Sequence, residues 1–345
     1  MIEISGAVYK QAWIDGVMPP PERVQPGIWS IPVPIPKNPL RYVIVYALEL
    51  PNGVAIVDAG WDTSEAWDAL VGGLGEAGYA IGDVREVLVT HMHPDHYGLA
   101  GRVREESGAR ISMHPADADL LVSRYVEPEK LMTGMKAMFI EAGVPSDEAD
   151  ILSNASMNVR QYVSVAMPDL LLEDGDELGL ATWDLKAIWT PGHSPGHLCF
   201  YDATRRIAIT GDHVLPRITP NISLQPQRRD PLADYLDSLL KVRDLEADEV
   251  LPAHEYRFRG LATRVDQLIA HHSDRLDEII AALVVLPGST CWELAAKLTW
   301  SRSWEETQGF LRRAATGETF AHLALLERQG RIRREGDPAA RWFVV

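Results

Sequence analysis

Three histidines and an aspartate are packed into six residues of this chain, His91-Met92-His93-Pro94-Asp95-His96. They directly follow a run of apolar residues that predicts a buried strand. In an extended chain alternate side chains point the same way, so His91 and His93 share a face, and Asp95 and His96 face a second position. Polar groups at the end of a buried strand need partners. The spacing therefore predicts a site for two adjacent metal ions.

Three further donors each lie just past an apolar run. His193 lies in a turn rich in glycine and proline at residues 190–197, Asp212 ends a predicted strand, and His254 follows another. Strands that share one sheet would bring these residues to a common edge, where loops on a rigid scaffold commonly form catalytic sites.

The order and spacing of these residues resemble the metallo-β-lactamase superfamily of metal-dependent hydrolases, whose signature is His-x-His-x-Asp-His. The phrases at residues 191–197 and 211–213 are similar to those of its glyoxalase II-like and thioesterase-like branches. The resemblance covers about residues 28 to 280. It implies an α+β fold, a four-layer αββα sandwich, here with a helical insert and a small C-terminal winged-helix-like domain.

The resemblance also implies a ligand set. Metal one would be held by His91, His93 and His193, metal two by Asp95, His96 and His254, and both metals by a bridging Asp212. Asp58 matches an aspartate at the end of an early strand and is expected to support a ligand rather than to bind metal. His197 and His213 are expected to be structural. Nitrogen and oxygen ligands without thiolate favour zinc, with iron or manganese as alternatives.

Two such cations would hydrolyse a substrate with a bridging hydroxide, and Asp95 could pass a proton to the leaving group. We expect a carbonyl substrate: a thioester, an ester or a lactone. One alternative is a phosphodiesterase or endoribonuclease that uses the same metals. A second alternative is a binding protein without activity, which the complete ligand set disfavours.

Composition limits the partners. The 345 residues carry a net charge of −16, which disfavours nucleic acid at the metal site. No apolar run approaches the length of about 18 residues expected of a membrane span. The two cysteines, Cys199 and Cys291, indicate neither a disulfide framework nor a thiolate metal site. We therefore expect a cytoplasmic enzyme with a small-molecule acyl substrate and no membrane partner, with a homodimer left open.

Three segments are predicted. Residues 1–40 are rich in proline and are expected to form an extended arm rather than a strand. Residues 41–286 would form the catalytic domain, in which 115–168 is a helical insert rich in methionine. That insert is either an apolar lid over the substrate, with Met135 and Met138 in its wall, or plain helical core or a dimer face.

The remaining residues, 287–345, have the pattern of three short helices and a two-stranded wing. The helices are expected at 292–298, 306–316 and 318–327, and the strands at 331–334 and 341–345. We expect this module to serve packing or oligomerisation rather than nucleic-acid recognition.

Regular elements are predicted in the catalytic domain as well. They are a hairpin at 42–57, helices at 63–78, 99–107, 230–245 and 261–283, and strands at 87–90, 110–113, 185–189 and 198–201.

A few other side chains are weaker candidates. Tyr97 and Asn221 could line the substrate pocket, and Arg257 and Arg259 either anchor an anionic substrate tail or lie exposed on a loop. The adjacent His271 and His272 are expected at a helix surface or an interface. The endoribonuclease alternative would rely on four arginines of the C-terminal module: Arg328, Arg331, Arg333 and Arg334.

Overall fold

The computed structural model describes residues 1–155, 157–224 and 230–345. The chain divides into two compact units. Unit 1 comprises residues 1–121, 159–220 and 238–265, and unit 2 comprises residues 122–158, 221–237 and 266–345. Most of the predicted insert therefore falls in the same unit as the C-terminal segment, and the domain boundaries expected from the sequence stay predictions.

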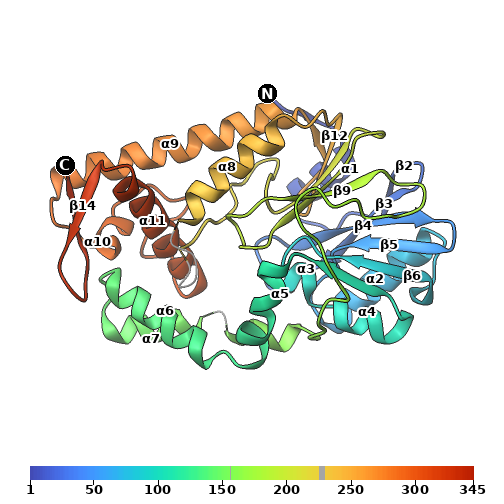
Figure 1. Ribbon diagram of the computed structural model, residues 1–345, viewed down its shortest axis with the longest axis horizontal. Coiled ribbons are helices and arrows are strands. Elements are labelled where there is room, and N and C mark those ends of the chain that lie inside the picture. The colour runs from blue at the N-terminus through green and yellow to red at the C-terminus, as the bar shows by residue number, and fades with distance from the viewer. Residues whose placement is uncertain (156, 225–229) are drawn as a thin grey trace. The chain divides into compact units, whose positions relative to one another are not determined.

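Within the described residues, unit 1 holds two mixed β-sheets (Figure 1). The larger sheet has seven strands in the spatial order β2-β3-β4-β5-β6-β7-β8. The strands are β2 (Glu22–Gln25), β3 (Ile28–Pro34), β4 (Tyr42–Leu50), β5 (Gly53–Val57), β6 (Val84–Leu88), β7 (Arg110–Met113) and β8 (Leu170–Leu171). Strands β5 to β8 run parallel, and the other pairs are antiparallel.

The second sheet has six strands in the order β1-β13-β12-β11-β10-β9. The strands are β1 (Glu3–Ile4), β9 (Leu185–Trp189), β10 (Leu198–Asp202), β11 (Ile207–Gly211), β12 (Glu249–Pro252) and β13 (Phe258–Arg259). Its only parallel pair among these strands is β11 with β12.

One hydrophobic core joins the two sheets. Ile44 and Tyr46 of the larger sheet belong to the same buried cluster as Phe200 and Ile209 of the smaller one. This sandwich confirms the predicted α+β class, and the predicted hairpin at 42–57 is the β4–β5 pair. Burial of apolar side chains from both sheets is the main force that holds such a sandwich together.

Unit 1 also contains helices, which are α1 (Ala7–Asp15), α2 (Ser64–Glu76), α3 (Pro94–Tyr97), α4 (Ala100–Ser107) and α5 (Pro115–Leu121), with the 3-10 turn η1 (Ile81–Asp83). Helix α2 packs on β3, and α4 packs on β6 and β7, so these two helices cover the larger sheet (Figure 1). The side chain of Thr63 caps α2 by accepting a hydrogen bond from the amide of Ala66.

Two helices have residues in both units, α8 (Pro231–Arg243) and α9 (Leu261–Val285). Unit 2 contains α6 (Glu129–Glu141), α7 (Ser146–Asn154), α10 (Cys291–Ala295) and α11 (Phe310–Arg328), the π-helical turn η2 (Val122–Val126) and the hairpin of β14 (Ile332–Glu335) and β15 (Arg341–Val344). The 3-10 turn η3 (Met157–Tyr162) lies at the boundary. Among the described residues, no helix has both the length and the apolar character that crossing a membrane requires.

The predicted extended arm is wrong for much of residues 1–40. Residues 28–34 form β3, which pairs with β4 along its whole length. The register with β2 ends at Ser30, so Pro32 and Pro34 lie where that side of β3 is a sheet edge. Proline is tolerated at such an edge because no ladder donor is needed there.

The predicted helices at 306–316 and 318–327 are also corrected, because α11 is continuous from Phe310 to Arg328. Gly317 lies between the two predicted helices. A Cβ at this position would lie 2.8 Å from Oγ of Ser223. The glycine therefore serves close packing within the helix rather than its end. The predicted two-stranded wing is present as the β14–β15 hairpin, while a winged-helix module as a whole stays a prediction.

Candidate metal centre

The predicted ligands all follow the carboxyl ends of strands in unit 1. The parallel strands β5 and β6 bring Asp58 and residues 91–96 to one edge of the larger sheet. The parallel strands β11 and β12 do the same for Asp212 and His254 in the smaller sheet. His193 follows β9, which is antiparallel to β10, as β10 is to β11, so β9 ends at that same edge.

Three imidazole nitrogens form a first cluster. Nδ1 of His93 lies 2.9 Å from Nε2 of His91 and 3.0 Å from Nε2 of His193. Ligand nitrogens of a tetrahedral zinc ion, with bonds near 2.05 Å, would be about 3.3 Å apart. The three nitrogens are therefore close to the spacing that one cation requires.

A second cluster lies beside it. Oδ2 of Asp95 is 3.5 Å from Nε2 of His96 and 3.4 Å from Nε2 of His254. Asp212 contacts both clusters with different oxygens: Oδ2 lies 3.5 Å from Nε2 of His193, and Oδ1 lies 3.1 Å from Nε2 of His254. All seven predicted ligands thus come together as two adjacent groups, which is the arrangement of a binuclear metal site.

Buried atoms in this cluster lack hydrogen bonds. Nε2 of His96, Nε2 of His254 and Oδ1 of Asp212 are shielded from solvent and make none. An orphaned polar atom in a protein interior is costly. Oδ1 of Asp212 lies 3.6 Å from Nε2 of His96 and 3.1 Å from Nε2 of His254 without a hydrogen bond to either. Because imidazole and carboxylate are ligands of divalent metals, the residues fit a metal site.

The charges of the cluster also suit a cation. Burial lowers the pKa of His254, but Asp212 and Asp95 offset this and raise it to about 10. Burial would raise the pKa of Asp212, yet His254 and His96 hold it well below its usual range. Without metal, protonated imidazoles balance the carboxylates, and metal binding releases such protons.

Other groups contact the Nδ1 atoms of two predicted ligands, on the side of the ring away from the cluster. Oδ2 of Asp58 lies 2.7 Å from Nδ1 of His96, and the same carboxylate accepts hydrogen bonds from the amide and hydroxyl of Thr90. Nδ1 of His254 lies 2.9 Å from the carbonyl oxygen of Tyr42, which can only accept. Both contacts fix the tautomer that leaves Nε2 free to bind metal.

His197 contributes to the same support. Its Nδ1 contacts Oγ1 of Thr190 at 2.8 Å, and its Nε2 accepts a hydrogen bond from the amide of Asp212. Because both ring nitrogens are engaged, His197 is a structural residue beside the metal ligands. His213 is fully buried next to it, and burial lowers its pKa to about 3.

Several weaker candidates lie in structural contacts instead. Arg257 is buried and pairs with Glu22 and Glu249, and Arg259 also pairs with Glu249. Arg257 fits neither of the two expected alternatives, whereas Arg259 is exposed, as the second alternative had it, but lies on β13 rather than on a loop. Their ion pairs connect β13 and the residue before it with Glu249 of β12 and with Glu22 of β2 in the larger sheet.

Tyr97 and Asn221 are likewise engaged in packing. The Tyr97 hydroxyl donates to the carbonyl of Ala166 at 2.6 Å. The Asn221 amide contacts Oε2 of Glu318 within unit 2 at 3.3 Å. Neither contact involves a metal ligand.

One buried acid near the predicted ligands, Asp117, was not predicted from the sequence. Asp117, at the start of α5, is fully buried and accepts hydrogen bonds from the amides of Met92 and Gly196. Backbone amides leave no pattern in the sequence, so no motif marked this residue.

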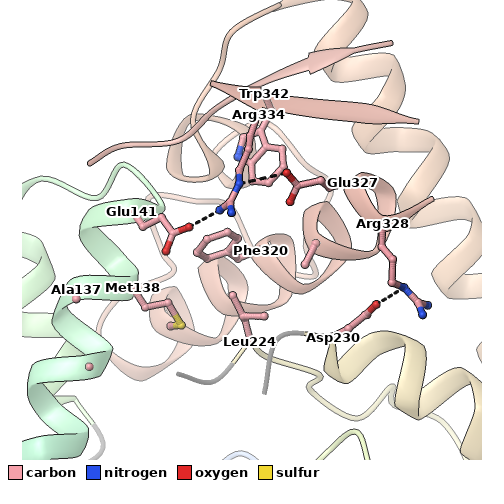
Figure 2. Close-up of a pocket in the computed structure, with 12 residues that line it drawn as sticks. Ala137, Met138, Glu141, Leu224, Asp230, Phe320, Glu327, Arg328, Arg334 and Trp342 are labelled. Atoms are coloured by element: carbon pink, nitrogen blue, oxygen red, sulfur yellow. Dashed lines mark hydrogen bonds and ion pairs between the residues drawn. The ribbon is translucent and has the colours of Figure 1, made fainter. Parts of the chain in front are cut away.

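Unit 2 has a pocket of its own, with a volume near 710 Å³ (Figure 2). Met138, Leu224 and Phe320 supply apolar lining, and Arg334 lies at the rim between Glu141 and Glu327. All of its lining residues belong to unit 2, whereas all seven predicted metal ligands belong to unit 1.

The methionines of the insert pack inside unit 2. Met135, Met138 and Phe139 of α6 are buried, and α6 packs on α7. These contacts fit the helical-core alternative, and the lid stays a prediction. His272 is also buried, with Nδ1 3.1 Å from Nε2 of His322, so its expected position at a helix surface is wrong.

Comparisons with known proteins agree with this geometry. The family model described as metallo-beta-lactamase superfamily matches residues 39–254. The chain is 24% identical to the probable metallo-hydrolase YqjP of Bacillus subtilis, over 84% of this chain and 89% of that protein. It is 27% identical to the human acyl-coenzyme A thioesterase MBLAC2, over 48% of this chain and 54% of that protein.

Solved structures extend the likeness to the whole chain. A metallo-beta-lactamase family protein from Thermus thermophilus is 33% identical, with a TM-score of 0.80 over 94% of this chain and 100% of the other. A beta-lactamase domain protein from Burkholderia ambifaria is 27% identical, with a TM-score of 0.81 over 100% of this chain and 98% of the other.

Proposed function

This chain belongs to the metallo-β-lactamase superfamily, and we propose that it is a binuclear metal-dependent hydrolase that cleaves a thioester, an ester or a lactone. The observation that carries the proposal is the convergence of seven imidazole and carboxylate side chains, with three buried atoms that make no hydrogen bond.

The two clusters suggest the ligands of each ion. Metal one would be held by His91, His93 and His193, metal two by Asp95, His96 and His254, and both by Asp212. The two oxygens of Asp212 face different clusters, which supports its bridging role. A donor set of nitrogen and oxygen without sulfur favours zinc.

A pair of such ions would supply an activated water and polarise the oxygen of the substrate carbonyl. The chain's own residues would orient the substrate and protonate its leaving group. Asp95 lies beside His96 and His254 but keeps 14% of its side chain exposed. We assign it the transfer of a proton to the leaving group, because it is an acid of the cluster that solvent and substrate can reach.

Two observations favour a carbonyl substrate. One similar protein is named as an acyl-coenzyme A thioesterase, although the chain spans only about half of its length. The net charge of −16 disfavours a polyanionic substrate such as RNA.

The phosphodiesterase or endoribonuclease alternative has less support. The four arginines that it would use are each paired with acids of unit 2: Arg328 with Asp230, Arg331 with Asp277, Arg333 with Glu335, and Arg334 with Glu141 and Glu327. Paired arginines attract phosphates weakly. We therefore assign the C-terminal helices and hairpin, which we interpret as winged-helix-like, a packing role.

The deciding experiment is a panel of substrates with the metal-loaded protein. The substrates are an acyl-thioester, an aryl ester, a lactone, a bis-aryl phosphodiester and a short single-stranded RNA, each with and without chelator. Turnover of a carbonyl substrate that chelator stops and zinc restores is the expected result. Turnover of only the phosphodiester or the RNA would contradict the proposal.

A variant complements the panel. Asp212→Ala removes the oxygens that face both clusters, so we expect it to abolish turnover and to weaken the binding of both metals. Full activity of this variant would overturn the metal assignment.

A further inference from the structure

The buried carboxylate of Asp117 lies outside the seven proposed ligands but ties two of their loops together. Its Oδ2 accepts hydrogen bonds from the amide of Met92 and the hydroxyl of Ser194, both at 2.8 Å. Its Oδ1 accepts one from the amide of Gly196 at 2.6 Å. One carboxylate thus bridges two segments about one hundred residues apart in the sequence.

These two segments carry the first ligand cluster. Met92 lies between His91 and His93, and Ser194 directly follows His193. A shift of either loop relative to Asp117 would change the 3.0 Å separation between Nδ1 of His93 and Nε2 of His193.

The contact is also sterically specific. A Cβ on Gly196 would lie 2.6 Å from the amide nitrogen and 2.8 Å from Cβ of Asp117. Real Cβ atoms do not approach so closely, so this glycine allows the loop of His193 to reach the carboxylate.

The second cluster is held by different groups. Asp58 contacts Nδ1 of His96, and the carbonyl oxygen of Tyr42 contacts Nδ1 of His254. Asp58 reaches the first cluster only indirectly, through Thr90, whose hydroxyl also contacts Nδ1 of His91, whereas Asp117 contacts the loop of His193 directly.

We propose that Asp117 is a positioning residue for metal one, and that it fixes the spacing of His91, His93 and His193 more strongly than the spacing of the ligands of metal two. The inference rests on the proposed function, because it assumes the two ligand sets assigned there. Hydrogen bonds from buried donors to a charged carboxylate are among the stronger ones in proteins, so their loss should be measurable.

The test is the zinc affinity of Asp117→Asn, measured by competition with a chromophoric chelator. The amide keeps one acceptor oxygen, so the backbone amide of either Met92 or Gly196 must lose its hydrogen bond. Substitutions of residues that support metal ligands typically lower affinity about 10- to 100-fold, and we expect a loss of that size at metal one.

Two variants, each lacking one ligand, separate the effects on the two metal sites. In His254→Ala, which cripples metal two, adding Asp117→Asn should lower the remaining zinc affinity. In His193→Ala, which removes a ligand of metal one, the same addition should lower the remaining zinc affinity much less. An equal loss in both backgrounds, or no loss in either, would overturn the inference.

A milder variant and a control variant complete the test. Ser194→Ala removes only one hydroxyl contact and should give a smaller loss confined to metal one, even if Asp117→Asn folds poorly. Asp202→Asn is the matched control, because Asp202 is equally buried and accepts hydrogen bonds from the amides of Asp184 and Arg205, but lies at the carboxyl end of β10, opposite the sheet edge that carries the ligands. A zinc loss in Asp202→Asn as large as in Asp117→Asn would show a merely structural effect.

Failure of the proposed function can be distinguished from failure of the role proposed for Asp117. If the wild-type protein binds fewer than two zinc ions, the binuclear site itself is wrong. If it binds two and Asp117→Asn matches it, only the role of Asp117 is wrong.

Discussion

The ligand histidines differ in what holds the ring nitrogen that faces away from the metal site. For His96 it is the carboxylate of Asp58, for His254 the carbonyl oxygen of Tyr42, and for His91 the hydroxyl of Thr90. A carboxylate partner raises the basicity of its imidazole more than a neutral oxygen does. The contribution of each partner to metal binding should therefore differ.

Asp58→Asn tests the carboxylate partner. Asp58 has a φ of +64°, a left-handed conformation that asparagine also tolerates, so the backbone should be kept. The variant removes the charge next to Nδ1 of His96, and we expect zinc affinity to fall about 10- to 100-fold. Chelator competition measures it.

The control for this variant is Glu86→Gln. Glu86 is also a buried acid of the larger sheet, but it pairs with Arg110 on the neighbouring strand. Its loss should cost stability and leave zinc affinity unchanged. Asp58→Asn with wild-type affinity would show that the contact with His96 is not needed for binding.

Two histidines buried against each other in unit 2, His272 and His322, should make the stability of the protein depend on pH. Burial lowers the pKa of His322 to about 4 and that of its partner His272 well below its usual value. Their neighbours Arg275 and His271 act in the same direction. Because the native pKa is lower than the unfolded value near 6.5, the stability is complete above pH 6.5 and falls as the pH drops toward 4.

Urea unfolding at pH 7.5 and pH 5 measures this effect. For His322 alone the loss at pH 5 should be about 1–2 kcal/mol. The variant His322→Gln should be less stable at pH 7.5 but should lose less between the two pH values. Because the metal ligands titrate equally in both proteins, the difference isolates His322, and identical losses would refute the assignment.

At the level of elements, what the sequence could predict was local. The proposed ligands could be identified because six residues hold four of them and each later donor follows an apolar strand. Asp117 could not be found in that way, since its partners are backbone amides at positions 92 and 196. Their proximity arises only when the two sheets pack together.

The mistaken elements have the same cause. Proline was interpreted by its local preference, as a sign of an extended arm, and residues 306–316 and 318–327 were predicted as separate helices on either side of Gly317. In the structure Pro32 and Pro34 lie where β3 pairs with β4 but no longer with β2, and Gly317 lies inside α11 against Ser223. Tertiary contacts set the conformation at these positions and outweigh the local preference.

Helix α2 offers a direct comparison of two adjacent glycines. Gly72 is exposed, and a Cβ at this position would have no atom within 4 Å, whereas a Cβ on Gly73 would lie 2.3 Å from Cγ2 of the buried Ile31. Gly72→Ala should therefore stabilise the protein by about 0.5–1 kcal/mol through helix propensity. Gly73→Ala should destabilise it, because the β-branched Ile31 has few rotamers with which to yield.

Urea unfolding midpoints measure both variants, and the two glycines control for each other. They share the helix and the substitution, so they differ only in the contact with β3. Equal shifts of the two midpoints would contradict the packing of α2 on this strand.

At the scale of the whole molecule, the proposed chemistry is confined to one of the two units. All seven proposed ligands lie in unit 1, whereas the buried histidine pair and the pocket of Figure 2 lie in unit 2. Metal binding stabilises only those conformations in which the site is formed. The two units should therefore respond differently when metal is removed.

Hydrogen exchange of the metal-loaded and chelator-treated protein measures this difference. We expect removal of metal to speed amide exchange in residues 89–97, 190–197 and 210–213, because loops that lose their ligand bonds open more often. Amides of α11 should exchange at the same rate in both samples. The variant Asp212→Ala serves as the control, since it should show fast exchange in these loops whether or not zinc is added. If exchange in α11 rose as much as in the loops, the two units would unfold as one cooperative block, and metal bound in unit 1 would stabilise the entire chain.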